Sequence, residues 1–156
     1  MYNTILLAAA LQRWERYSAH ALAAREVAAA LVQPTSKRLH VLSAYEYEYL
    51  PQMSELSLAM RAQFEQESKQ RTDALMMQKL EEYVAPLLAD GITVEKILRV
   101  GTARDVIVQV ATNIQADLVI IGSHSKRGLL DISLGGTAQH VSRHAPCTVV
   151  LVSPKP

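Results

Sequence analysis

The sequence predicts an α/β protein, a Rossmann-like, doubly wound sheet of five parallel strands flanked by helices. Short apolar segments alternate with longer segments in which apolar residues recur every three or four positions. Residues 5–10 are continuously apolar and residues 116–122 nearly so, which is typical of parallel strands covered on both faces. The length of 156 residues suits one such unit. We therefore expect a single domain over residues 1–156.

The first half of the chain predicts two strand–helix pairs. The expected elements are a strand at 5–10, an amphipathic helix at 14–32, a strand at 39–44 and a long helix at 54–89. Pro86 lacks a backbone N–H, so the long helix should kink or restart in its last turn. Tyrosines alternate with glutamates over residues 45–49, a pattern that we interpret as a strand end or a loop.

The second half predicts two more helices and three strands. These are a strand at 92–100, a helix ending near 115, a strand at 116–122, a helix at 136–144 and a strand at 148–152. Thr102 and Asp105 suggest a capping box, in which the hydroxyl and the carboxylate bond free backbone N–H groups. Strands alternating with helices imply right-handed crossovers and a ligand crevice at the carboxyl ends of the strands. Ala10, Ala44 and Gly122 should lie near it.

Composition excludes several classes of function. Sixteen Lys and Arg against fifteen Asp and Glu give a net charge of +1, too balanced for a protein that neutralises nucleic-acid phosphates. The single Cys147 cannot form an internal disulfide, so we expect a cytoplasmic protein. The apolar run at 5–11 has no preceding Lys or Arg and is too short to span a bilayer. Neither nucleic acid nor membrane is expected as a partner.

The glycines direct the search for a site to the last third of the chain. All six follow residue 90, and Gly122 and Gly135 flank a segment that contains Lys126 and Arg127. Glycines at a helix N-terminus let a phosphate approach backbone N–H groups. The segment is neither a Walker A motif nor a dinucleotide fingerprint. It is interpreted as a phosphate cradle or as a turn, and the two cations as a phosphate clamp or a solvated loop.

Other chemically suggestive residues favour structural interpretations. His140 and His144 are spaced for one helix face, but no third metal ligand is nearby in sequence, so no metal site is predicted. His124 between two serines lacks the Gly-x-Ser-x-Gly elbow of a hydrolase, so a catalytic triad is rejected. Cys147 follows a proline beside the last strand and is expected to be a buried structural thiol rather than a redox sensor.

The C-terminal residues resemble the universal stress proteins. That family has a Gly, two residues, a Gly, nine residues, then Gly followed by Ser or Thr, and later a His-Ala-Pro-Cys-like turn before an apolar strand. Here Gly122 and Ser125 are followed after nine residues by Gly135 and Gly136, and His144 begins the turn. The resemblance also covers residues 2–7, 39–41 and 116–122, and thus nearly the whole chain.

The resemblance implies a site for ATP or AMP in this glycine-rich loop, with three departures. Ser125 stands where the second glycine lies, and Gly136 stands where the family has Ser or Thr. The Asp that contacts the nucleoside in ATP-binding members falls at Ala10, and the contacts from the second strand run through backbone at Val41. The candidate nucleotide-binding residues are Ala10, Val41, Gly122, His124, Ser125, Lys126, Arg127, Gly135, Gly136 and Thr137.

We therefore expect a stress-response protein that binds an adenine nucleotide. The alternative is a nucleotide-free homodimeric interaction or regulatory module of the same family, which Ala10 favours. No catalytic base or Mg²⁺ carboxylate is identified near the glycines, so at most a slow ATPase is expected. The resemblance also implies a homodimer, formed by antiparallel pairing of the last strand near Val150, and a further protein partner is compatible with it.

Overall fold

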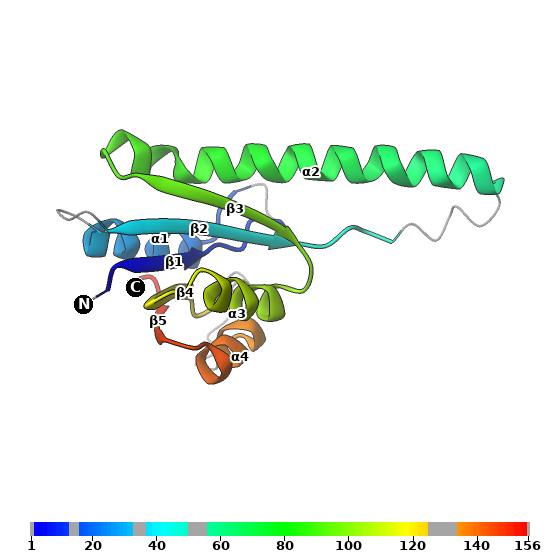
Figure 1. The fold of residues 1–156 in the computed structure, drawn as a ribbon. Coiled ribbons are helices and arrows are strands. Elements are labelled where there is room, and N and C mark those ends of the chain that lie inside the picture. Colours follow the sequence, from blue (N-terminus) through cyan, green and yellow to red (C-terminus); the bar gives the residue numbers. More distant parts are fainter. Residues whose placement is uncertain (1, 13–15, 33–36, 50–55, 125–133, 156) are drawn as a thin grey trace.

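Five parallel strands form one sheet in the order β3-β2-β1-β4-β5 (Figure 1). The structure is a computed structural model that describes residues 2–12, 16–32, 37–49, 56–124 and 134–155. The strands are β1 (Thr4–Ala8), β2 (Arg38–Tyr45), β3 (Val94–Val100), β4 (Leu118–Gly122) and β5 (Thr148–Val152). The helices are α1 (Ala19–Val32), α2 (Leu58–Ala89), α3 (Ala103–Asn113) and α4 (Gly136–His144). The predicted fold class is confirmed.

The middle of the sheet is apolar because it is covered on both faces. All five residues of β1 are buried, and Leu7 pairs with Val41 of β2 on one side and Ile120 of β4 on the other. Helices α1 and α2 cover one face, where Ala24 and Leu80 belong to the first core cluster. Helices α3 and α4 cover the opposite face, which holds the second cluster (Figure 1). Continuous apolar strands are what this two-sided burial requires.

The long helix α2 begins later than the sequence predicts and ends at the predicted residue, Ala89. It begins at Leu58, where the Ser57 hydroxyl accepts a hydrogen bond from the Met60 N–H, and it runs through Pro86 as one helix. Of the two outcomes expected at Pro86, a kink or a restart, the restart does not occur, because few backbone bonds remain to lose so near the helix end and Leu87 anchors that turn in the core. The N-terminal half of α2 extends beyond the sheet (Figure 1), and its first buried residue is Met76.

Two other helix boundaries also shift for identifiable reasons. Helix α1 begins at Ala19 rather than at 14, because the Ser18 hydroxyl accepts a bond from the Ala21 N–H and caps the helix there. Helix α3 ends at Asn113, and Gln115 adopts a φ of 52°, a left-handed conformation that ends a helix. None of the helices in the described ranges combines the length and apolar character needed to cross a membrane.

Candidate functional site at the carboxyl ends of β1 and β4

The neighbouring strands β1 and β4 mark the point where strand order reverses, and a ligand site is expected at their carboxyl ends. From β1 the chain proceeds outward to β2 and β3, whereas from β4 it proceeds to β5 on the other side. A doubly wound sheet binds ligands in the crevice outside the carboxyl ends of such strands. Ala8 at the end of β1 pairs with Ile121 of β4. The segments that leave the two strands therefore start side by side, as the sequence predicts for Ala10 and Gly122.

Most of the predicted site residues in the described ranges lie at this edge, and one does not. Ala10 is exposed after β1, Gly122 ends β4, and His124 follows it half-buried. Val41 lies in the middle of β2, fully buried, with its backbone in the ladder to β1 and β3. The predicted contacts from Ser125, Lys126 and Arg127 lie outside the described residues.

The N-terminus of α4 is held close to the end of β4. Gly135 is the N-cap, and its N–H donates to the Ser123 carbonyl at 2.9 Å. A Cβ on Gly135 would lie 3.3 Å from that carbonyl oxygen, whereas a Cβ on Gly136 would meet nothing within 4 Å. No side chain in the described part of the chain caps the helix. The first backbone N–H groups of a helix have no acceptor within the helix. The N–H groups of Gly136 and Thr137, at the start of α4, are therefore free to bind an anion.

Sequence reasoning missed a buried serine–histidine contact beneath this helix end. Ser123 is 6% exposed, and its Oγ lies 3.2 Å from Nδ1 of His20 in the first turn of α1. The same Nδ1 lies 3.4 Å from the Val152 carbonyl oxygen. Both contacts are favourable when Nδ1 carries the proton, and Nδ1 is then unable to accept a proton from Ser123. In that tautomer the contact holds Ser123 against α1 and β5.

The segment after β1 is fastened to β2 and α2 by polar contacts that no motif reveals. The Gln12 side-chain amide donates to the Glu46 carbonyl and accepts from the Glu46 N–H at 2.9 Å. Lys79 Nζ donates to the carbonyls of Leu11 and Gln12 at 3.1 and 3.3 Å. Leu11 is 1% exposed in the first core cluster. The segment after β1 is consequently fixed by α2 and by the continuation of β2.

The tyrosines after β2 form a carboxylate-centred cluster. The hydroxyls of Tyr45 and Tyr47 both donate to Oδ1 of Asp73 at 2.6 Å. These two bonds lower the pKa of Asp73, whereas burial and the bond to Asp73 raise the pKa of Tyr45. Tyr49 is exposed. The interpretation of residues 45–49 as a strand end and loop is confirmed, since β2 ends at Tyr45.

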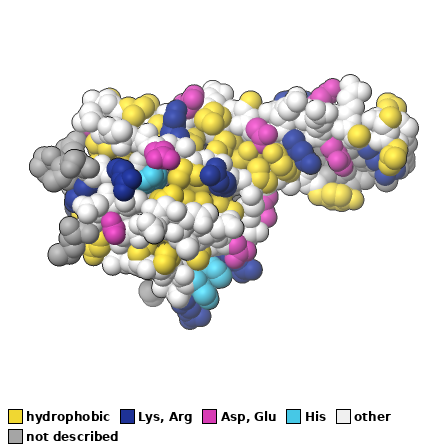
Figure 2. All heavy atoms as spheres, in the orientation of Figure 1, with side chains coloured by type: hydrophobic (Ala, Val, Ile, Leu, Met, Phe, Trp, Pro, Cys, Tyr) yellow, Lys and Arg dark blue, Asp and Glu magenta, His cyan; other side chains and the backbone are white. Residues whose placement is uncertain are grey.

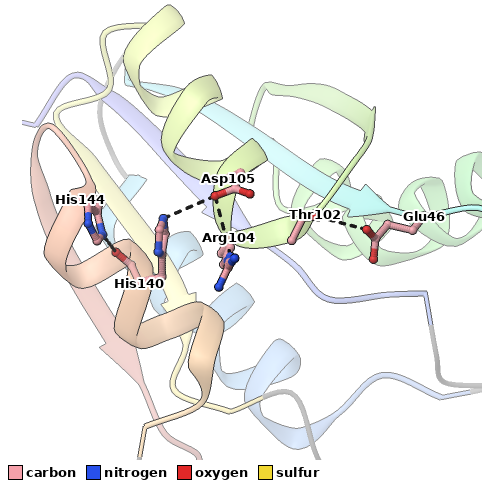
Figure 3. A network of polar contacts seen from close by, with 6 residues as sticks. All are labelled: Glu46, Thr102, Arg104, Asp105, His140 and His144. Carbon is pink, nitrogen blue, oxygen red and sulfur yellow. Dashed lines mark hydrogen bonds and ion pairs between the residues drawn. The ribbon is translucent and has the colours of Figure 1, made fainter.

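The predicted capping box at α3 is wrong. Figure 3 shows the Thr102 hydroxyl directed to the Glu46 carboxylate, at 3.1 Å, and Thr102 makes no side-chain bond to its own helix. The carboxylate of Asp105 lies 3.6 Å from Nε2 of His140 and 3.8 Å from Nε of Arg104. Tertiary neighbours thus compete successfully with the local bonds that the sequence pattern suggests.

The histidines of α4 are occupied by structural contacts. The rings of His140 and His144 stack with centroids 4.2 Å apart, and Nδ1 of His144 lies 2.8 Å from the His140 carbonyl oxygen (Figure 3). Within the described part of the chain, no group of three His, Cys, Asp or Glu could hold a metal ion. Cys147 is half-buried, and burial raises the pKa of its thiol, which disfavours the reactive thiolate.

Comparison with known proteins identifies the family. The family model described as the universal stress protein family matches residues 1–153. The chain belongs to the universal stress protein family. A universal stress protein of Thermus aquaticus is 32% identical over 156 residues, which cover 97% of this chain and 99% of that protein. The universal stress protein Sll1388 of Synechocystis is 32% identical over 84 residues, 54% of this chain and 53% of that protein.

Solved structures of universal stress proteins share the fold. The structure of MJ0577, a universal stress protein of Methanocaldococcus jannaschii, has a TM-score of 0.79 at 25% identity and covers 100% of this chain and 99% of that chain. A universal stress protein in complex with cAMP has a TM-score of 0.65 at 22% identity, with coverage of 99% and 98%. An Arabidopsis thaliana family member with AMP bound has a TM-score of 0.64 at 18% identity, with coverage of 98% and 92%.

Proposed function

We propose that this universal stress protein binds an adenine nucleotide, ATP or AMP, at the carboxyl edge of its sheet and acts in a stress response in the cytoplasm. The phosphates lie at the N-terminus of α4, near Gly135, Gly136 and Thr137, together with the loop that contains Ser125, Lys126 and Arg127. The nucleoside lies toward the segment after β1. The AMP and cAMP complexes of proteins with the same fold support this class of ligand.

The observation that carries the proposal is the uncapped start of α4. Among the described residues, its first N–H groups have neither an intrahelical acceptor nor a side-chain cap, and a Cβ on Gly136 would meet no described atom within 4 Å, which leaves room for a phosphate oxygen. The helix dipole adds partial positive charge at the same place. A helix end of this kind is stabilised by an anion, and nucleotide phosphate is the anion that the family's structures supply.

The segment after β1, where the nucleoside would lie, predicts that nucleotide binds weakly rather than not at all. Ala10 provides no carboxylate, so one hydrogen bond to the sugar or base is lost relative to members with Asp at this position. A missing bond of this kind costs on the order of 1–3 kcal/mol, about tenfold or more in affinity. The segment after β1 is otherwise held in place by Gln12 and Lys79. The backbone of the site therefore remains available to a ligand.

The second candidate function is a nucleotide-free interaction module that works as a homodimer. Ala10 favours the interaction module. It is exposed at the position where ATP-binding members have the Asp that contacts the nucleoside, and its methyl group cannot make that contact. In neither case do we propose a catalytic residue. A slow ATPase would need a base and a Mg²⁺-binding carboxylate, and the sequence identifies neither near the glycines.

The nucleotide proposal is tested by comparing two glycine variants. We expect Gly135→Val to weaken ATP binding more than about tenfold, because its side chain crowds the Ser123 carbonyl and the approach to the helix end. Gly136→Ala should also weaken ATP binding, but less, because its Cβ meets no described protein atom and only takes space left for a phosphate oxygen. Ser142→Ala, which removes an exposed hydroxyl on α4 bonded only locally to the Gln139 carbonyl, is the control and should change affinity less than about threefold. Isothermal titration calorimetry measures all three.

Chromatography of nucleotide released from denatured, freshly purified protein provides the independent arm. Adenine nucleotide in the eluate supports the proposal. Wild-type protein that carries none and gives no heat with ATP or AMP would instead support the interaction module.

A further inference from the structure

The residue from which the candidate ligand loop departs is bonded to three other elements. The Ser123 N–H donates to the carbonyl of Val152, the last residue of β5, at 2.8 Å. The Ser123 carbonyl accepts from the N–H of Gly135, the N-cap of α4, at 2.9 Å. Its Oγ lies 2.7 Å from Oγ of Ser153. The position of Ser123 therefore determines where the N-terminus of α4 sits relative to the sheet.

His20 fixes the side chain of Ser123 from the opposite direction. Its Nδ1 lies between two oxygens, Oγ of Ser123 at 3.2 Å and the Val152 carbonyl at 3.4 Å. A Cβ on Gly122 would lie only 2.9 Å from Cβ of His20, so a glycine is required at 122 for α1 to approach this closely. His20 thus bridges the first turn of α1 to the ends of both β4 and β5.

A second imidazole extends this contact toward the helix end. The ring of His124 packs edge-on against that of His20, with centroids 5.8 Å apart. Nδ1 of His124 lies 3.5 Å from the position that a Cβ on Gly135 would take. His20, Ser123 and His124 consequently form a continuous support from α1 to the N-terminus of α4.

We infer that His20 is a positioning residue for the phosphate side of the nucleotide site, an inference that rests on the proposed function. His20 acts through Ser123 rather than by touching the ligand. It donates from Nδ1, holds Ser123 between β4 and β5, and so holds the Gly135 N–H and the N–H groups that follow it. Donors that are already held in place bind an anion more tightly, because they lose less conformational entropy on binding.

Three substitutions of His20 separate this role from simple packing. Asn places a polar atom near the position of Nδ1, Gln places one near Nε2, and Ala retains only the Cβ that contacts Gly122. We expect His20→Ala and His20→Gln to weaken ATP binding about fivefold, the value of one neutral hydrogen bond, and His20→Asn to restore most of the loss. Adenosine affinity should change less than about twofold, since adenosine has no phosphate.

A double-mutant cycle tests whether His20 acts through Ser123. If it does, the variant with both His20→Ala and Ser123→Ala binds ATP no more weakly than Ser123→Ala alone. Ser142→Ala, which removes an exposed hydroxyl on α4 bonded only locally to the Gln139 carbonyl, is the control and should leave affinity unchanged. Additive losses, or equal losses for ATP and adenosine, would overturn the inference.

Amide hydrogen exchange tests the same support without any ligand. The Gly135 N–H should exchange at least about threefold faster in His20→Ala than in wild type, and His20→Asn should restore its protection. Unchanged exchange in His20→Ala overturns the positioning role. Wild-type protein that binds no nucleotide would refute the proposed function alone, because the exchange experiment still measures the support of α4 by His20.

Discussion

Asp117 shows how much a single side chain outside any motif contributes to the sheet. Its Oδ2 accepts hydrogen bonds from the backbone N–H groups of Asn3 and Thr4, each at 2.9 Å. The Asp117 N–H donates to the Thr4 carbonyl at 2.8 Å. The residue before β4 thus holds the start of β1, more than a hundred positions earlier in the chain. These N–H donors lower the pKa of the Asp117 carboxyl by stabilising its ionised form.

The lowered pKa of Asp117 predicts a defined loss of stability in acid. A carboxyl whose pKa is lower folded than unfolded stabilises the protein above its unfolded pKa of about 4, and that contribution is lost as pH falls through the folded value. We expect the free energy of unfolding to fall below about pH 4, and to fall less steeply in Asp117→Asn, which accepts similar bonds without titrating. Urea titrations from pH 7 to 3 measure both slopes, with Glu26→Gln, on the exposed face of α1, as control. Parallel pH profiles for wild type and Asp117→Asn would contradict the expectation.

At the scale of elements, one tyrosine joins the two helices on the first face of the sheet. Tyr83 of α2 is fully buried, and its hydroxyl donates to the Ala21 carbonyl of α1 at 2.6 Å. Arg25 of α1 returns a bond to the Tyr83 carbonyl at 2.9 Å, and its guanidinium lies 5.2 Å from the ring centroid. The Tyr17 ring packs edge-on against the same ring. Burial raises the pKa of Tyr83, so its hydroxyl remains a neutral donor at physiological pH.

Removing the Tyr83 hydroxyl should therefore loosen α2 from α1. We expect Tyr83→Phe to lower the free energy of unfolding by about 1–2 kcal/mol, because the Ala21 carbonyl loses a buried donor while the ring packing is kept. Tyr17→Phe is the comparison, since the Tyr17 hydroxyl donates to the Lys79 carbonyl at 3.1 Å in a more exposed position. Its loss should be smaller. Chemical denaturation followed by circular dichroism measures both, and equal effects would show that burial does not decide the value of the bond.

At the scale of the whole molecule, both edge strands of the sheet are incompletely buried, since six of the seven residues of the edge strand β3 are exposed or half-buried. β5 is the last strand in the sheet order, and four of its five residues are exposed or half-buried. The face drawn in Figure 2 carries cationic and anionic side chains interspersed, so it offers no single-signed surface to a charged partner. An apolar strand edge invites pairing with a second copy, which is consistent with the proposed homodimer.

The register of β5 identifies one position where a proline should prevent dimerisation and another where it should disrupt the fold. The Val152 carbonyl accepts from Ser123, so Val152 and, two residues earlier, Val150 direct their backbone groups toward β4. Val149 then directs its N–H outward, to the proposed partner. We expect Val149→Pro to give folded monomer, because proline is tolerated where an edge N–H faces away from the sheet. Val150→Pro removes a donor that faces β4 and should unfold or aggregate the protein.

Light scattering with circular dichroism distinguishes the two proline variants. A wild-type monomer, or a Val149→Pro protein that remains a dimer, would exclude pairing through β5.

The sequence by itself determined the succession of strands and helices, the parallel sheet and the family. These depend on apolar periodicity and on the glycines that follow the strands, which are local properties of the chain. The location of the candidate site, at the end of β4 where Gly122 lies, was also predictable, since parallel strands all have their carboxyl ends on one side of the sheet.

Only the tertiary structure decided the partners of individual polar groups. The Thr102 hydroxyl bonds Glu46 instead of its own helix, and His20 meets Ser123 across 103 positions of sequence. No periodicity encodes such pairs, because each depends on where two separate elements come to rest against the sheet. The buried Ser123 hydroxyl takes a partner that packing brings within reach, because leaving it without one costs free energy. The Thr102 hydroxyl is exposed, so it gives up the local cap for Glu46 at little cost.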